Sequence, residues 1–147
     1  MRLVYFCLFT LVLFSCKKEE DQAAKDDKII QTYLKEHSLT ATKTSTGLYY
    51  IILNEGTGTT PTLTSDIKVN YKGYLTDSTV FDETTTDYRI FTLYELISGW
   101  QEGLQYTKEG GKIMLFVPSN LGYGANTKGT IPANSVLIFE IELLDVL

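Results

Sequence analysis

Cysteine and histidine, the side chains behind much enzymatic chemistry, are rare in this chain of 147 residues. The cysteines are Cys7 and Cys16, and the one histidine is His37. The region from Gly47 onward therefore has neither a thiol nor an imidazole. A histidine-containing triad, a thiol nucleophile, a disulfide and a cysteine or multi-histidine metal site are all excluded there. Most hydrolase and metalloenzyme mechanisms are thereby excluded for that region.

An aromatic side chain is the next candidate for a functional group. The chain's one tryptophan, Trp100, stands in the segment ELISGWQEGL, after the apolar pair Leu96 and Ile97 and between Gly99 and Gly103. A lone tryptophan can fill a core or form the flat floor of a pocket that binds an apolar ring. Its own segment does not decide between the two, so the elements around it must.

Composition indicates a globular protein with no basic surface. The chain is 44% hydrophobic and 21% charged, with a formal net charge of −5. Its lysines and arginines do not form a stripe, so a nucleic-acid partner is not expected. The 10 tyrosines, together with many threonines, favour a domain rich in β-structure.

The N-terminus predicts an export signal. Arg2 precedes an apolar run from Leu3 to Phe14, which is too short to span a bilayer and has the length of a signal-peptide core. The run ends in LFSC, which resembles a bacterial lipobox, so we expect a signal peptide over residues 1–15 and a diacylglyceryl group on Cys16. The alternative is a plain signal peptide with a chance cysteine.

A charged segment, CKKEEDQAAK, follows over residues 16–25 and suits a lipidated, solvated tether. We therefore expect a chain anchored through Cys16 to a membrane of the cell envelope, most simply the outer membrane. The periplasmic and surface faces both stay open.

A short amphipathic helix is predicted over residues 26–39, followed by a polar connector that ends at residue 46. Its apolar residues form one stripe: Ile29, Ile30, Tyr33 and Leu34. Asp26 and Asp27 would suit the positive end of the helix dipole. The pattern does not decide whether the helix packs on the main domain or between two chains.

From Gly47 to Leu147 the patterns are mainly those of strands. DIKVNYKGYL alternates strictly and places Ile67, Val69 and Tyr71 on one face. The other strand segments are LYYIILN, RIFTLYE, KIMLFV and SVLIFEIELLDVL, whereas ISGWQEGLQY has room only for a short helix. We predict an α+β fold with a sheet of about five antiparallel strands around one short helix, in one domain over residues 47–147.

Five of these segments, in order, closely resemble the FK506-binding-protein (FKBP) family of peptidyl-prolyl isomerases. They are VNYKGYL, VFD, LISGWQEGL, KIMLFVPSNLGYGA and IPANSVLIFEIELL. The resemblance covers roughly Gly47 to Leu147 and implies a bent half-barrel sheet with a pocket between the sheet and the helix. The N-terminal helix followed by GLYY is also similar to lipoprotein members from gliding bacteria, the gliding-motility-associated isomerases of Bacteroidetes.

The resemblance implies roles for nine residues. Those expected to act in catalysis are Tyr71, Phe81, Asp82, Trp100 and Tyr123, and those expected to bind substrate are Leu96, Ile97, Ile131 and Phe139. By this resemblance Trp100 is the pocket floor, while the Tyr123 hydroxyl and the Ile97 N–H donate hydrogen bonds to carbonyls. Asp82, hydrogen-bonded to Tyr71, would have a supporting electrostatic role and would not act as a general base.

The implied reaction agrees with the missing thiols and imidazoles. An X–Pro bond isomerises over a barrier of about 18–20 kcal/mol because amide resonance must be broken. The twisted transition state is less dipolar than the planar amide, so a dry aromatic pocket favours it, and no nucleophile, metal or cofactor is needed. We expect a peptidyl-prolyl cis-trans isomerase for X–Pro bonds of exported or envelope proteins, with FK506-type macrolides as further ligands.

The alternative function is an envelope chaperone or assembly factor with the same fold and little or no turnover. Two departures from the family pattern motivate it. The segment RIFTLYE, before Trp100, is shorter than the family spacing, and Thr130 stands where a second apolar residue is common. Both lie on the expected pocket rim, where they would alter substrate preference before they altered the fold.

Overall fold

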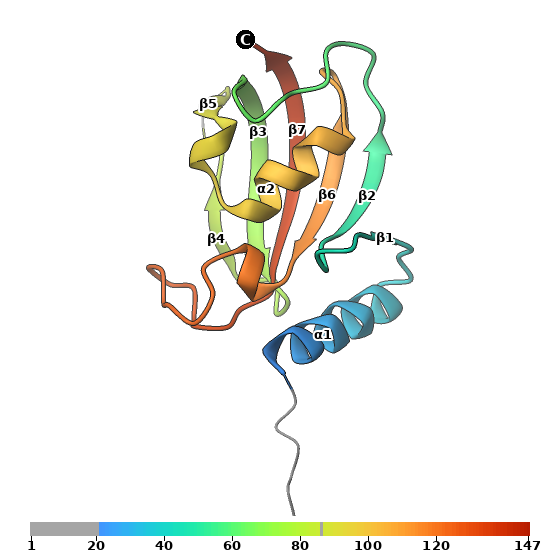
Figure 1. Cartoon of the computed structure of the whole chain (residues 1–147), viewed down its shortest axis with the longest axis vertical. Helices are drawn as coiled ribbons and strands as arrows, with labels where there is room; N and C mark the ends of the chain where they lie inside the picture. Colours follow the sequence, from blue (N-terminus) through green and yellow to red (C-terminus); the bar gives the residue numbers. More distant parts are fainter. Residues whose placement is uncertain (1–20, 86) are drawn as a thin grey trace, which may run out of the picture.

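A computed structural model describes residues 21–85 and 87–147. The predicted signal peptide and the lipidation site at Cys16 lie outside these residues. An antiparallel sheet bends around the short helix α2, and a longer helix, α1, lies at one end of the sheet (Figure 1). The helices and strands follow in the order α1 (Gln22–Glu36), β1 (Thr42–Lys43), β2 (Tyr49–Asn54), β3 (Asp66–Leu75), β4 (Val80–Glu83), β5 (Arg89–Thr92), α2 (Ser98–Gly103), β6 (Lys112–Val117) and β7 (Leu137–Val146), with 3-10 turns at Leu93–Glu95, Leu104–Tyr106 and Ser119–Leu121.

The sheet has the strand order β1-β2-β6-β7-β3-β4 and stays open. Strand β3 pairs with β7 along one side. On its other side β3 pairs with β5 through its first half and with β4 through its second half. The predicted fold class is thus confirmed, but in the part of the chain that the structure describes the sheet has seven strand segments where about five were expected. Two short segments share one edge of β3, and the two-residue β1 extends the opposite edge.

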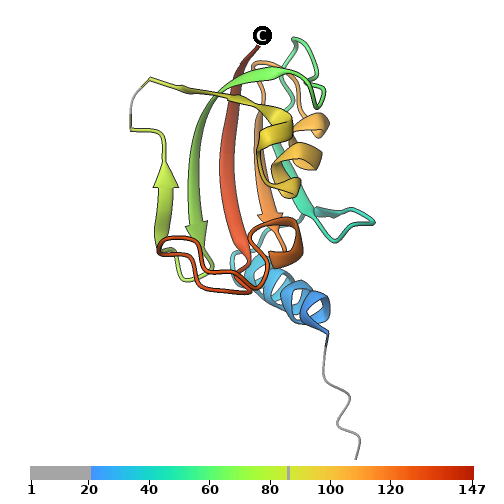
Figure 2. The same cartoon turned by 60° about the vertical axis from the view of Figure 1, so that its left-hand side comes forward.

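Alternation along the strands divides the apolar residues between the two faces of the sheet. The inner face, toward α2, carries the larger core, including the predicted triple of Ile67, Val69 and Tyr71. Residues of β6 and β7 on the opposite face form a second cluster, which α1 covers. The curvature of the sheet and the position of α2 in its hollow are clear when the molecule is turned (Figure 2).

Two glycines allow α2 to lie directly on β6. A Cβ atom at Gly99 would lie 2.5 Å from Cγ1 of Val117, and one at Gly103 would lie 2.6 Å from Cδ2 of Leu115. Close approach to the sheet is therefore the reason for both glycines. This approach brings Trp100, between them, against the inner face of the sheet.

Helix α1 packs on the domain, which the sequence had left open. It begins at Gln22 and ends at Glu36, so the expected start at Asp26 was wrong. Asp26 lies inside the helix and is fully buried, so it is not at the N-terminal dipole. Of the predicted stripe, Ile30, Tyr33 and Leu34 are buried in the second cluster, whereas Ile29 is 40% exposed.

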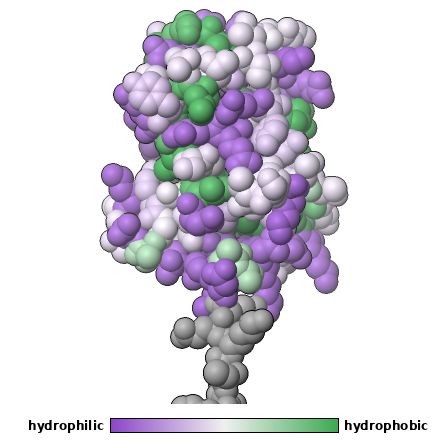
Figure 3. All heavy atoms as spheres, viewed as in Figure 1, coloured by the Kyte–Doolittle hydropathy of each residue, from purple (hydrophilic) through white to green (hydrophobic). Residues whose placement is uncertain are grey.

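On the face that carries α2, hydrophobic residues form separate patches among hydrophilic ones (Figure 3). Within the described ranges, none of the helices has the length and apolar character needed to cross a bilayer.

Candidate active site

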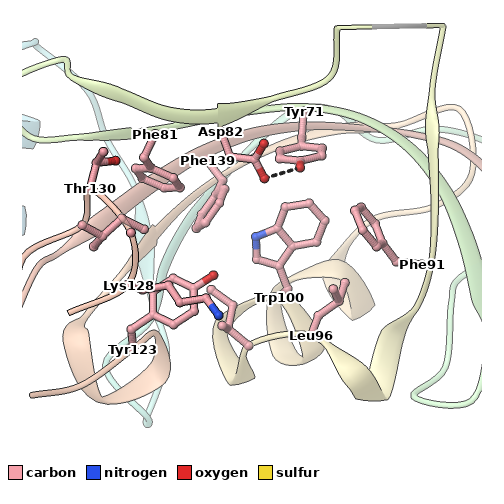
Figure 4. Close-up of a pocket in the computed structure, with 13 residues that line it drawn as sticks. Tyr71, Phe81, Asp82, Phe91, Leu96, Trp100, Tyr123, Lys128, Thr130 and Phe139 are labelled. Atoms are coloured by element: carbon pink, nitrogen blue, oxygen red, sulfur yellow. Dashed lines mark hydrogen bonds between the residues drawn. The ribbon is translucent and has the colours of Figure 1, made fainter. Parts of the chain in front are cut away.

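A cavity of about 360 Å³ opens between the inner face of the sheet and the segment that leads into α2. Its walls come from strands β3, β4, β5 and β7, from α2, and from the long connection between β6 and β7 (Figure 4). The lining residues are Tyr71, Phe81, Asp82, Phe91, Leu96, Ile97, Trp100, Tyr123, Lys128, Gly129, Thr130, Ile131 and Phe139.

Trp100 forms the base of the cavity and is fixed by three aromatic neighbours. Its indole meets Tyr71 at a centroid distance of 5.2 Å, Phe139 at 5.3 Å and Phe91 at 6.2 Å, each nearly perpendicular. Such edge-to-face contacts are the favoured geometry for aromatic rings. Trp100 is only 4% exposed yet lines the cavity, so it is both a core residue and a pocket floor.

The wall formed by β3 and β4 carries a polar pair. The Tyr71 hydroxyl donates a hydrogen bond of 2.5 Å to Oδ2 of Asp82. Burial raises the pKa of the Tyr71 phenol above its usual value, and the hydrogen bond to Asp82 raises it further. The predicted contact between the two residues is confirmed, but Asp82 is exposed on the strand edge and is not enclosed in an apolar pocket.

The Phe81 ring packs directly on a glycine of the neighbouring strand. A Cβ atom at Gly73 would lie 2.6 Å from the Phe81 ring and 2.8 Å from the Phe139 ring. The two rings themselves meet edge to face with centroids 5.5 Å apart. Strand β3 therefore leaves room at Gly73 for an aromatic pair that forms one side of the cavity.

The opposite wall comes from the connection between β6 and β7. A tight turn there is closed by two hydrogen bonds, from the Lys128 N–H to the Ile131 carbonyl and from the Ile131 N–H to the Lys128 carbonyl, at 3.0 and 2.9 Å. Tyr123 lies on the same wall, and its hydroxyl points into the cavity (Figure 4). Burial raises the pKa of the Tyr123 phenol, and the negative charge of Asp82 adds to the effect.

The segment before α2 supplies a backbone donor. Nε2 of Gln101 donates to the Leu96 carbonyl at 2.7 Å and to the Tyr94 carbonyl at 2.9 Å, which fixes the chain as it enters the helix. Among the described residues, no backbone carbonyl accepts the N–H of Ile97. Since Ile97 lines the cavity, this N–H can serve a bound carbonyl.

All nine residues singled out from the sequence line this cavity, although their individual roles remain predictions. Four further lining residues were not among them: Phe91, Lys128, Gly129 and Thr130. Phe91 is on the inner face opposite Ile67, but a four-residue strand does not reveal its pairing partner from sequence. Lys128 and Gly129 lie in an irregular loop whose pattern gives no such signal, while Thr130 was expected only as a rim residue.

The composition of the cavity limits its chemistry. Among its lining residues are two phenols, one carboxyl group, one amine and one threonine hydroxyl, but no thiol or imidazole. The flat aromatic base suits a small apolar ring, and the hydroxyl of Tyr123 and the N–H of Ile97 suit carbonyl oxygens. The site can therefore hold a small apolar ring and hydrogen-bond carbonyl oxygens beside it.

Comparison with known proteins agrees with this geometry. The sequence model of the family "FKBP-type peptidyl-prolyl cis-trans isomerase" matches residues 57–144, which lie within the predicted domain. The chain is 45% identical over 141 residues to the FKBP-type peptidyl-prolyl cis-trans isomerase FkpA of Buchnera aphidicola, in an alignment that covers 91% of this chain and 56% of the relative. The chain thus spans about half the length of the curated relatives it matches.

Two crystal structures share the fold. FkpA from Escherichia coli superposes with a TM-score of 0.75 and 39% identity, over 84% of this chain and 60% of that one. A peptidyl-prolyl cis-trans isomerase from Pseudomonas syringae pv. tomato superposes with a TM-score of 0.72 and 32% identity, over 86% of this chain and 97% of that one. The second match extends over nearly the whole of a shorter protein, so the likeness is not limited to one segment.

Proposed function

Because the chain belongs to the family of FKBP-type peptidyl-prolyl cis-trans isomerases, we propose that its aromatic cavity catalyses the cis–trans isomerisation of X–Pro peptide bonds. The observation that carries the proposal is the convergence in one cavity of Trp100, Tyr123 and the Ile97 N–H, a flat base with two hydrogen-bond donors. The alternative of a chaperone with little turnover gains no support from the site, because none of the nine predicted lining residues is displaced from it.

In the proposed mechanism, the proline ring lies on the indole of Trp100, flanked by Phe81 and Phe139. The Tyr123 hydroxyl and the Ile97 N–H hold carbonyl oxygens of the peptide on either side of the ring. The twisted transition state is less dipolar than the planar amide, so it loses less solvation when the cavity encloses it. Only this difference between the two states lowers the barrier.

The rim of the cavity bears on which proline-containing sequences are bound. Thr130, one of the two departures from the family pattern, and Lys128 give one side of the cavity a hydroxyl and an amine. The residues that flank the proline would meet these groups, whereas the proline itself would meet only aromatic surface. We therefore propose that the site binds proline-containing polypeptides, and that FK506-type macrolides occupy the same cavity.

The proposed substrates are exported or envelope proteins, and the proposed anchor is a lipid on Cys16. Support comes from the sequence alone, in the apolar run and the LFSC segment that precede the tether. The test of the anchor is a substitution of Cys16. Cys16→Ser should abolish labelling by a radioactive fatty acid and release the protein from membranes. The matched control is Cys7→Ser, within the apolar run, which should change neither. Continued labelling of the Cys16→Ser variant would contradict the anchor.

The isomerase proposal is tested by the refolding of a protein whose slow step is proline isomerisation. Catalytic amounts of the full-length chain should accelerate that step, and an FK506-type macrolide should abolish the acceleration. Uncatalysed isomerisation takes tens to hundreds of seconds, so even modest catalysis is measurable. A slow phase that keeps its uncatalysed rate at every concentration of the chain would contradict the proposal.

A further inference from the structure

Helix α1 places a buried acidic side chain against the loop that carries Tyr123. Asp26 is fully buried, although most of the helix surface around it is exposed. Both oxygens of its carboxyl group accept hydrogen bonds. Oδ1 accepts from Nε2 of Gln22 at 2.7 Å, and Oδ2 accepts from Ser119, at 2.7 Å from the backbone N–H and 2.6 Å from Oγ. A buried acid with so complete a set of donors is a built contact, since an unpaired one would be costly.

Ser119 connects this contact to the backbone on both sides of Tyr123. Its carbonyl accepts the N–H of Gly122 at 3.0 Å and the N–H of Gly124 at 2.7 Å. The N–H and hydroxyl of Ser119 thus bind Asp26, and its carbonyl holds the two residues that flank Tyr123. The Gly124 carbonyl in turn accepts the N–H of Asn134 at 2.8 Å, which ties this turn to the chain beyond Ile131.

Several contacts other than the one between Asp26 and Ser119 also attach α1 to the sheet. Ile30, Tyr33 and Leu34 bury an apolar face against the second core cluster. Asp27 also binds the Lys43 ammonium at 2.6 Å and the Tyr49 hydroxyl at 2.7 Å. These contacts hold the helix on the sheet. Of the two neighbouring acids, only Asp26 is hydrogen-bonded to the loop after β6.

We propose that Asp26 is a positioning residue for Tyr123, so that α1 fixes one wall of the cavity although none of its residues lines it. The inference rests on the proposed function, in which the Tyr123 hydroxyl orients a carbonyl of the substrate. Small displacements of a positioning group can change rates strongly, because the reacting geometry is lost. Helix α1 is then part of the working site and more than a spacer between the anchor and the domain.

The test compares Asp26→Ala with Asp27→Ala in the full-length chain. The second variant is a matched control, because it removes the neighbouring acid of the same helix and leaves the loop contact intact. Asp26→Ala should lower kcat/KM roughly ten-fold, mainly through kcat, whereas Asp27→Ala should leave it unchanged. Asp26→Asn, which keeps an acceptor oxygen, should restore part of the activity.

A double-mutant cycle separates positioning from a general effect on the fold. In a Tyr123→Phe background, Asp26→Ala should lower kcat/KM by less than about two-fold, because the hydroxyl through which it acts is already gone. An equal loss in both backgrounds would overturn the proposal. So would an Asp26→Ala protein with normal kcat/KM, which would reduce the contact to a docking role.

Hydrogen exchange provides a readout that does not depend on catalysis. Asp26→Ala should speed the exchange of the Gly122 and Gly124 amides and leave the amides of β3 and β7 protected. Uniformly faster exchange, or no change at the two glycines, would overturn the proposal.

If Asp26→Ala does not fold, Ser119→Ala removes one bond of the same contact from the loop side, and the same outcomes apply. A wild-type chain without isomerase activity would defeat the proposed function, and the exchange result would still decide the inference.

Discussion

The Tyr71 hydroxyl donates a hydrogen bond of 2.5 Å to the Asp82 carboxyl group across the β3–β4 edge, with Tyr71 buried and Asp82 exposed. The bond fixes the phenol whose ring meets Trp100 edge to face. It links a residue in water to the aromatic base of the cavity. Asp82 therefore has a structural task as the acceptor that fixes the Tyr71 phenol.

Asp82→Asn should have a modest effect, because the amide oxygen can still accept the Tyr71 hydrogen bond. We expect kcat/KM to fall by less than about ten-fold, since one neutral hydrogen bond is worth about 1 kcal/mol. Catalytic proton transfer contributes about 10²–10⁴-fold, so a loss of that size would instead assign Asp82 a general-base role. Steady-state kinetics with a proline-containing peptide measure the difference.

Phe81→Ala should impair catalysis far more than the neighbouring substitution Val80→Ala. Phe81 is half-buried on the cavity and packs edge to face on Phe139, whereas Val80 is 41% exposed and does not line it. Loss of about 1.4 kcal/mol of transition-state contact corresponds to ten-fold in rate, so we expect at least that decrease for Phe81→Ala. Equal activity of the two variants would contradict the assigned cavity.

Gly103→Ala should destabilise the protein, although alanine is the better helix former. In an exposed helix this change stabilises by roughly 0.5–1 kcal/mol. Here a Cβ atom would lie 2.6 Å from Leu115, so overpacking should cost about 1–3 kcal/mol. Urea unfolding measures it, with Ser98→Ala, at the exposed start of α2, as a control within about 0.5 kcal/mol of the wild type. A more stable Gly103→Ala protein would mean that α2 lies farther from the sheet.

Alkaline pH should ionise the two phenols of the cavity, Tyr71 and Tyr123, only above the range in which a phenol usually titrates. Burial is the main reason that the folded-state pKa values of Tyr71 and Tyr123 lie above the usual phenol value of about 10. A raised folded-state pKa means that the corresponding stabilisation is complete below pH 10 and is lost as pH rises beyond it. Ultraviolet absorbance of phenolate should therefore show that Tyr123→Phe removes a group that titrates above pH 10, and not one at or below it.

The sequence alone determined which apolar residues of β3 share a face of the sheet. The alternation in β3 placed Ile67, Val69 and Tyr71 together because successive side chains of a strand point to opposite faces. The same sequence excluded thiol and imidazole chemistry from the domain, since composition does not depend on folding. The ordered family segments then identified nine residues of the cavity, because each lies within a recognisable local pattern.

Only the tertiary structure decided how the remaining parts meet. The place of Phe91 in the cavity depends on the pairing of β5 with β3, and a four-residue strand is compatible with many partners. Asp26 was expected at the helix start, because its carboxylate would suit the positive end of the helix dipole. Its burial depends on Ser119, 93 residues away in the chain. Local sequence reports periodicity, whereas a long-range hydrogen bond exists only once the fold brings its two partners together.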